Sequence, residues 1–308
     1  MQGIEISRAF YEEYGKPMIE SEFSQYKDRL AIGLVGHGSE CFGFDDEVSR
    51  DHDFEPAFCI WLTDEDEKEF GFRLFRAYQR LPREFCGTKL KEKSLLGGET
   101  KGVMTISDFY RRYTGRSGPP ESDLDWLYTP SHYLAEATNG EVFFDALGEF
   151  TRIRSEIKNG MPEDVRLKKI ASCAFYMAQT GQYNLKRCLT HGERGASRLA
   201  LSDFVRNAIE LTFLLNHAHM PYYKWAFRSM RLLKILGDRA ELLEELIDVH
   251  NIDDKKINDD VELFCSEIIL QLKAQGLSDS TSDYLENHAY CVNERIKNSR
   301  LRNMSVAL

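Results

Sequence analysis

The chain has 308 residues, of which 42% are hydrophobic and 12% aromatic, so it can bury one large core or two modest ones and does not belong to the disordered class. Its formal net charge of -10 opposes long-range attraction to a polyphosphate backbone. A long nucleic acid is therefore disfavoured as a partner, and a small molecule or a protein is favoured.

The N-terminal segment is charged where a secretory signal would be apolar, and no run of eighteen apolar residues occurs in the chain. We therefore expect a soluble, non-secreted protein with no membrane partner. Seven cysteines stand singly without a CxxC pair, which predicts reduced thiols rather than disulfides or a zinc site. This pattern indicates a cytoplasmic location.

The first half of the chain alternates helical and strand patterns. Apolar residues in 6–30 have the spacing of one or two amphipathic helices, and 65–81 is also helical in pattern. LAIGLVGHGSE, at 30–40, is a short apolar run that ends in glycines, which indicates a buried strand turning into a loop. Further strands are predicted at 51–62, 102–106 and 141–144. These elements predict a small mixed α/β domain over residues 1–155.

Beyond residue 155 the strand signals stop, and apolar residues recur at intervals of three and four. Pro162 and the acidic pair that follows it suit the N-terminus of a helix. Later helices are predicted at 198–217, 222–236, 239–249, 259–275 and 283–300, and the tail, 300–308, is predicted to be frayed. We therefore expect an α+β protein in which a small mixed-sheet domain is followed by an all-α helical bundle domain over 156–308.

The segment GHGSECFGFDDEVSRDHDF, at 36–54, carries the chemistry. Gly38 and Ser39 end a predicted strand, and their small size lets backbone amides approach phosphate groups, with the hydroxyl as a further donor. After eleven intervening residues, Asp51 and Asp53 are placed on the next predicted strand. Residues two apart in a strand point to the same face, so both carboxylates project together as oxygen ligands for Mg²⁺.

This arrangement resembles the signature of the polymerase-β-like nucleotidyltransferase superfamily, in which a Gly-Gly or Gly-Ser pair is followed after roughly ten residues by two acidic residues with one residue between them. The matching residues are Gly38, Ser39, Asp51, Asp53 and Phe54. His52 departs from the pattern, which prefers an apolar residue there. The superfamily includes antibiotic-modifying adenylyltransferases, which join such a head domain to a helical C-terminal domain.

The resemblance implies that an acceptor hydroxyl attacks the α-phosphate of an NTP, ATP by default, and that pyrophosphate leaves. Asp51 and Asp53 would bind Mg²⁺ or Mn²⁺, which neutralises the developing charge. Many members add a third acidic residue from a later strand. In the expected strand, GVMTISD, Met104 or Thr105 stands at that position, and Asp108, just beyond, is the candidate to replace the missing acid.

A second resemblance covers more of the chain. LPREFCG, DLDWL, GEVFFD and PYYKW resemble an uncharacterised bacterial family with the same head and tail, and the two resemblances together cover most of residues 31–236. In PYYKW, Lys224 is a candidate contact to the nucleotide phosphates, and a helix that buries the aromatic residues is the equal alternative. Asp125 and Trp126 are predicted to cap and anchor a helix, with orientation of the acceptor as the alternative. Asp145 is predicted to form a turn, with ligand binding at the end of a strand as the alternative.

These patterns lead to two functional hypotheses. The first is a Mg²⁺-dependent enzyme that transfers a nucleoside monophosphate, AMP by default, from an NTP to a hydroxyl of a small molecule or a protein. The alternative is a catalytically inactive nucleotide-sensing or partner-binding protein of the same fold, motivated by the missing third carboxylate. A third option, an antitoxin-like partner, has no support from particular residues.

Overall fold

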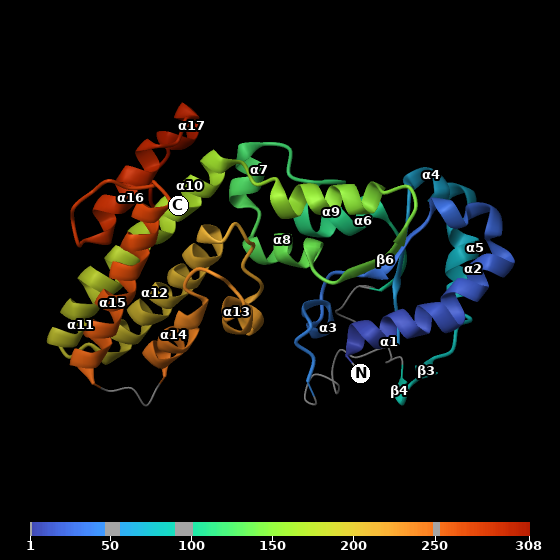
Figure 1. The fold of residues 1–308 in the computed structure, drawn as a ribbon, viewed down its shortest axis with the longest axis horizontal. Helices are drawn as coiled ribbons and strands as arrows, with labels where there is room; N and C mark the ends of the chain where they lie inside the picture. Colours follow the sequence, from blue (N-terminus) through green and yellow to red (C-terminus); the bar gives the residue numbers. More distant parts are fainter. Residues whose placement is uncertain (1, 47–55, 90–100, 249–252) are drawn as a thin grey trace. The chain divides into compact units, whose positions relative to one another are not determined.

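The computed structural model describes residues 2–46, 56–89, 101–248 and 253–308 (Figure 1). The chain divides into two compact units. The sheet unit comprises the residues up to Glu121 together with His132–Gly160, and the helical unit comprises Ser122–Ser131 together with Met161–Leu308. The first unit contains a small mixed sheet with helices and the described part of the second is helical, so the predicted α+β class is confirmed.

The sheet has four short strands. They are β1 (Ala31–Leu34), β2 (Cys59–Leu62), β5 (Gly102–Thr105) and β6 (Glu141–Asp145), in the spatial order β5-β2-β1-β6. β1 is antiparallel to β2 and β6, and β2 is parallel to β5. Gly33 pairs with Cys59, and Cys59 pairs with Gly102. The end of β1 therefore lies beside the beginnings of β2, β5 and β6, at what we call the loop edge of the sheet.

The strand predictions are confirmed for β5 and β6 to within one residue. β2 begins only at Cys59, and Pro56, which is inside the predicted strand, lies outside β2, as expected for a residue with no N–H to donate to a neighbouring strand. Asp51 and Asp53, in the first part of the predicted strand, lie outside the described residues. A separate ribbon pairs β3 (Glu84–Phe85) with β4 (Thr88–Lys89).

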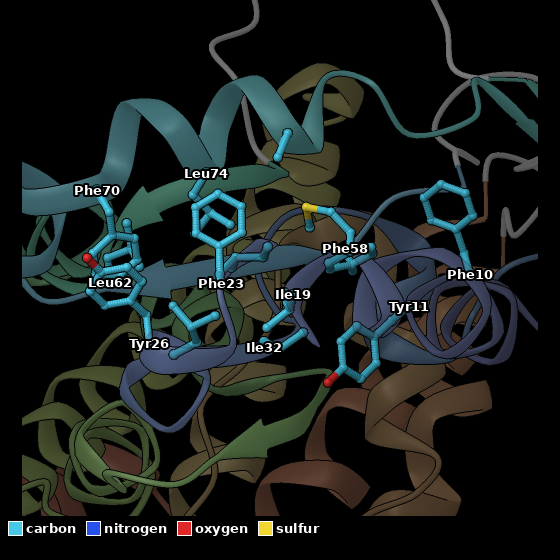
Figure 2. Packing of buried hydrophobic residues seen from close by; sticks show 14 residues of the cluster. Phe10, Tyr11, Ile19, Phe23, Tyr26, Ile32, Phe58, Leu62, Phe70 and Leu74 are labelled. Atoms are coloured by element: carbon cyan, nitrogen blue, oxygen red, sulfur yellow. The ribbon is translucent and has the colours of Figure 1, made fainter. Parts of the chain in front are cut away.

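One face of the sheet is covered by two helical segments, which confirms the predicted helices near 6–30 and 65–81. The first consists of α1 (Gly3–Phe10), η1 (Tyr11–Gly15), α2 (Lys16–Glu22) and η2 (Ser24–Arg29), and the second of α4 (Asp64–Asp66), η4 (Glu67–Gly71) and α5 (Phe72–Tyr78). Figure 2 shows the core between them, a cluster that includes Ile32 and Leu62 of the strands, Leu74 of α5 and Phe23, which directly follows α2. This core fixes both segments on the sheet.

The other face carries α6 (Ile106–Thr114) and α9 (Glu149–Asn159). Trp61 points to this face because its neighbours in β2 point to the first one. Its ring stacks on Phe150, with centroids 3.9 Å apart, and meets the Phe109 ring edge-on at 5.5 Å. The buried side chains of α9 are thus part of the sheet core, which explains why this unit extends to Gly160.

Tyr11 in this core supports a prediction about alkaline stability. Its burial, followed by the charges of Glu12 and Glu20, raises its pKa from 10.0 to about 12. A phenol whose pKa is higher in the folded state stabilises the fold fully below pH 10.0, and this contribution is lost as the pH rises through about 12. Tyr11→Phe, which cannot ionise, should therefore lose less stability than the wild type over this pH range, as measured by urea unfolding at successive pH values.

The exposed residue Tyr128 provides the control, because Tyr128→Phe removes a phenol that is 65% exposed. This variant should follow the wild-type curve. Parallel loss of stability in Tyr11→Phe and the wild type would show that the ionisation of Tyr11 does not limit alkaline stability.

The helical unit is built around α10 (Glu163–Met177), which packs on α12 (Arg194–Leu215) and α16 (Leu285–Glu294). The remaining elements are α7 (Asp123–Tyr128), η5 (Ala178–Leu185), α11 (Lys186–Thr190), α13 (Tyr223–Met230), η6 (Gly237–Arg239), α14 (Ala240–Ile247), α15 (Asp254–Ala274) and α17 (Ser299–Arg302). Each of the later predicted helices is confirmed in position, and those predicted at 222–236 and 283–300 are shorter than predicted. α7 packs on α10, although the chain returns to the sheet unit between them.

The prediction of a frayed tail is wrong. Leu301 in α17 is 1% exposed, and the buried ammonium of Lys168 donates hydrogen bonds to Asn293 Oδ1 at 2.8 Å and to the Met304 carbonyl at 2.7 Å. A buried lysine needs such acceptors, so Lys168 holds the tail against α10. The local sequence of the tail does not contain this partner.

Two further features concern the whole chain. All seven cysteines are free thiols, as their scattered positions predict. None of the helices within the described ranges combines the length and the hydropathy that a bilayer-spanning segment requires.

Candidate functional site

The candidate site begins where β1 ends and the chain turns into α3 (Ser39–Phe42). We call residues 36–39 the glycine loop. Gly36 and Gly38 have φ of +120° and +131°, which side chains with a Cβ rarely adopt. A Cβ on Gly36 would lie 2.7 Å from Tyr113 Oη, and one on Gly38 would lie 2.5 Å from a Glu40 carboxylate oxygen. Both positions therefore require glycine.

Asn139 holds the glycine loop in this conformation. Its Oδ1 accepts a hydrogen bond from Gly36 N at 2.8 Å, and its Nδ2 donates to Gly36 O at 2.8 Å. The next residue, Gly140, donates from its N to the Cys41 carbonyl at 2.7 Å. Arg154 Nη2 donates to the carbonyls of Asn139 and Gly140, each at 3.1 Å. The turn that precedes β6 thus holds the loop backbone at Gly36 and the start of α3 at Cys41.

The side chains of the glycine loop differ in exposure. Ser39 is only 3% exposed, so little of it is presented to solvent as the predicted phosphate donor. The His37 side chain is 60% exposed, and its Nδ1 lies 3.6 Å from Glu136 Oε1 on α8 (Ser131–Thr138). In this structure His37 is the exposed residue of the loop, whereas Gly36, Gly38 and Ser39 are buried.

A buried ion pair lies beneath the glycine loop. Lys101 Nζ is 2.6 Å from Glu40 Oε1, and the two side chains are 12% and 3% exposed. Lys101 directly precedes β5, so its ammonium lies at the loop edge of the sheet. Burial, followed by the charge of Glu136, raises the pKa of Tyr113, which keeps that phenol neutral beside the loop. The ammonium of Lys101 and the carboxylates of Glu40 and Glu136 are therefore charged groups that lie beside the loop.

Carboxylate oxygens that follow the loop in the chain are of the kind that binds a divalent cation. Among the described residues, Glu40 Oε2 and Asp45 Oδ1 are buried and accept no hydrogen bond. No group of three or more His, Cys, Asp or Glu within the described ranges is arranged to hold a metal ion. The predicted ligands, Asp51 and Asp53, lie outside these ranges, on the segment that connects Asp45 to β2. Carboxylate oxygens on this segment are compatible with Mg²⁺.

The structure does not bring Asp108 to the glycine loop. Thr105 pairs with Leu62 at the end of β5, whereas the loop lies beside the beginning of this strand. Four residues of strand, about 3.3 Å each, separate the two edges. The Asp108 carboxylate is instead bound to Arg111 Nη1 at 2.6 Å in the first turn of α6, and it is exposed. The structure therefore does not support the assignment of Asp108 as a third carboxylate.

Lys224 belongs to the helical unit, whereas Gly38 and Ser39 belong to the sheet unit. It is exposed on α13, with its Nζ 5.7 Å from the centroid of the Trp225 ring. Tyr222 and Tyr223 are 38% and 69% exposed, so the aromatic residues of PYYKW do not form the predicted core. The proposed phosphate contact of Lys224 stays a prediction.

Two other acidic residues have the structural roles that their sequence context predicts. Asp125 forms a capping box with Ser122 at the start of α7, with two hydrogen bonds of 3.1 Å. Asp145 accepts hydrogen bonds from Gly148 N at 2.9 Å and from Thr151 N at 2.8 Å, which organises the turn into α9. Neither carboxylate is assigned to the site.

Comparison with known proteins gives one match in sequence and one in structure. Residues 126–226 match DUF4037, a domain of unknown function. This DUF4037 segment covers about a third of the chain and agrees with the resemblance to an uncharacterised family. No curated protein matches the chain.

The structural match is the crystal structure of a nucleotidyltransferase-like protein from Exiguobacterium sibiricum 255-15. It is 12% identical, with a TM-score of 0.38, and the alignment covers 86% of this chain and 76% of that one. Similarity at this level does not by itself assign a fold or a function.

The DUF4037 segment contains the residues that hold the glycine loop from outside, namely Glu136, Asn139 and Arg154. Sequence reasoning missed them, together with Lys101 and Glu40. The available signals are the Asn-Gly dipeptide at 139–140, which is typical of a turn, and the acidic residue directly after Ser39.

Proposed function

We propose that this chain is a Mg²⁺-dependent nucleotidyltransferase, which transfers a nucleoside monophosphate, AMP by default, from an NTP to a hydroxyl of a small molecule or a protein. The observation that carries the proposal is the glycine loop, whose backbone is held by Asn139 in a conformation that only glycine permits. It is followed at the spacing of the superfamily signature by Asp51 and Asp53. A fixed backbone of this kind can bind phosphate oxygens without being reordered.

In the proposed reaction, an oxygen of the acceptor hydroxyl forms a bond to the α-phosphorus of the NTP. The bond from this phosphorus to the bridging oxygen of the β-phosphate breaks, and pyrophosphate leaves with the electron pair, while the hydroxyl proton passes to a base. The glycine loop positions the triphosphate, and Asp51 and Asp53 are the residues proposed to hold the metal. Mg²⁺ or Mn²⁺, when bound, neutralises the charge that develops on the phosphates.

A second candidate is a protein of the same fold that binds nucleotide and does not consume it. It is favoured by the composition of β5, which has no carboxylate, and by the position of Asp108 at the opposite edge. The two candidates agree on nucleotide binding and differ on pyrophosphate release.

A thermal-shift screen of the four NTPs, each with and without Mg²⁺, tests the shared part of the proposal. A ligand present at about 100 times its Kd stabilises the folded state by about 2.7 kcal/mol, so we expect a rise of a few degrees in Tm with one NTP and Mg²⁺. The rise should be lost in Asp51→Asn/Asp53→Asn and kept in Asp108→Asn. An equal rise in the double variant would contradict the proposed site.

Pyrophosphate release in the presence of an acceptor-containing extract then separates the candidates. Multiple turnovers that the double variant lacks would support the enzyme. Binding without any release of pyrophosphate, from every NTP that shifts Tm, would favour the nucleotide-sensing protein.

A further inference from the structure

A cavity of about 310 Å³ lies on the sheet unit, at the end of α2 and along α5. It is lined by Glu22, Phe23, Phe72, Arg73, Arg76 and Arg80. None of these residues belongs to the glycine loop or to the segment with Asp51 and Asp53. The volume is at the lower end of the range for small-molecule sites, which is about 300–1,000 Å³. We call it the arginine cavity.

The arginine cavity concentrates positive charge in an acidic protein. Arg73, Arg76 and Arg80 follow one another at intervals of three and four residues, so they project from one side of the helix and the turn after it. The residues that line the cavity contribute these three guanidinium groups and one carboxylate, that of Glu22. The formal charge of the whole chain is -10, so the cavity opposes the overall sign and suits an anion.

The three arginines are held to different degrees. Arg80 Nη2 binds both carboxylate oxygens of Glu22, at 2.9 and 2.6 Å, and Arg73 Nη2 donates to Tyr26 Oη at 3.3 Å. Arg76, between them, has no hydrogen-bond or ion-pair partner among the described residues. Its planar group is the one available for a two-point contact with a phosphate.

The cavity also has an apolar side. Phe72 is 73% exposed, while Phe23 is 3% exposed and forms part of the core beneath. An exposed phenylalanine beside guanidinium groups offers a face on which a ring can stack. The ligand best matched by these groups therefore has a phosphate and a ring.

We propose that the arginine cavity binds a small organic phosphate ester, with its phosphate on Arg76 and Arg73 and its ring against Phe72. Arginine forks match the geometry of phosphate oxygens, and a volume of about 310 Å³ favours a compact ligand over an extended acidic peptide. Glu22 weakens the binding of the ligand, because its carboxylate repels the phosphate and is bound to the guanidinium group of Arg80. This site does not depend on the nucleotidyltransferase activity proposed for the glycine loop.

Isothermal titration with phenyl phosphate, in the presence of EDTA, tests the proposal on the full chain. Arg76→Glu should weaken binding by at least about tenfold, which corresponds to about 1.4 kcal/mol. Glu22→Gln should tighten binding, because it removes the repulsion and releases Arg80. Arg152→Glu is the matched control, since Arg152 is exposed on α9 and pairs only on its own helix with Glu156, and its affinity should equal that of the wild type.

Three further titrations test the ligand class. Phenol and inorganic phosphate should each bind more weakly than phenyl phosphate, because each offers half of the contacts. If tetraglutamate binds more tightly than phenyl phosphate, the preferred ligand is an acidic peptide and the proposal is overturned. Equal affinities in Arg76→Glu and Arg152→Glu, or weaker binding in Glu22→Gln, would also overturn it.

Discussion

Gly140→Ala is expected to destabilise the sheet unit by about 2–5 kcal/mol. Gly140 has φ of +62°, and a Cβ there would lie well inside van der Waals contact with the Leu34 carbonyl oxygen. A left-handed alanine costs about 1 kcal/mol, and the overlap with backbone, which cannot rotate away, adds about 1–3 kcal/mol or more. Relief of this overlap would separate β1 from β6 and displace the Asn139 turn that holds the glycine loop.

Gly115→Ala is the matched control for this prediction. Gly115 has φ of +70°, and nothing lies within 4 Å of the position of its Cβ, so only the conformational cost of about 1 kcal/mol applies. Hydrogen exchange of the β1 and β6 amides measures the local effect, and the amides of α12 in the helical unit serve as an internal reference. Equal loss of protection in the two alanine variants would show that the close approach of Leu34 is unimportant.

Lys101→Met should cost about 3–5 kcal/mol, because it leaves the Glu40 carboxylate buried without its cation. The side chain of methionine has a similar length, so the change removes the charge with little change in volume. Unfolding in guanidinium chloride, followed by hydrogen exchange in the sheet unit, measures the loss. The effect should be large because Glu40 is 3% exposed and water cannot replace the ammonium.

Two controls separate the buried pair from ordinary surface charge. Lys101→Met/Glu40→Gln should recover most of the lost stability, since no buried charge is left. Arg152→Met breaks an exposed pair with Glu156 and should cost less than about 1 kcal/mol. If Lys101→Met costs no more than Arg152→Met, the ion pair beneath the loop has no special role.

The fold could be predicted largely from local patterns. Periodicity identified β5, β6 and the later helices, because each of these elements buries one face along its own length. The packed tail depends on Lys168, which is more than 100 positions away in the chain. The late start of β2 depends on the chain around Pro56, inside the predicted strand itself.

The site was predictable only in part, for a geometric reason. Gly38 is predicted from its residue type and spacing, and the structure gives it a positive φ, while its contact with phosphate stays a prediction. The position of Asp108 required the direction of β5 relative to the loop, and a sequence pattern does not distinguish a parallel neighbour from an antiparallel one. Asn139 and Lys101 are about 100 and 60 residues from the glycine loop, so only the folded chain shows that they belong to it.

The path of the chain between the units has a consequence for synthesis. The ribosome releases α7 before α8 and α9, yet α7 packs on α10, which is made later. Trp126 and Leu127 are both buried in the folded protein. They therefore lack their packing partner, α10, while the last part of the sheet unit emerges. N-terminal domains commonly fold as soon as they are complete. Here the sheet unit can fold only while this segment stays exposed, so a nascent chain that has emerged from the ribosome as far as residue 160 presents a hydrophobic surface to chaperones.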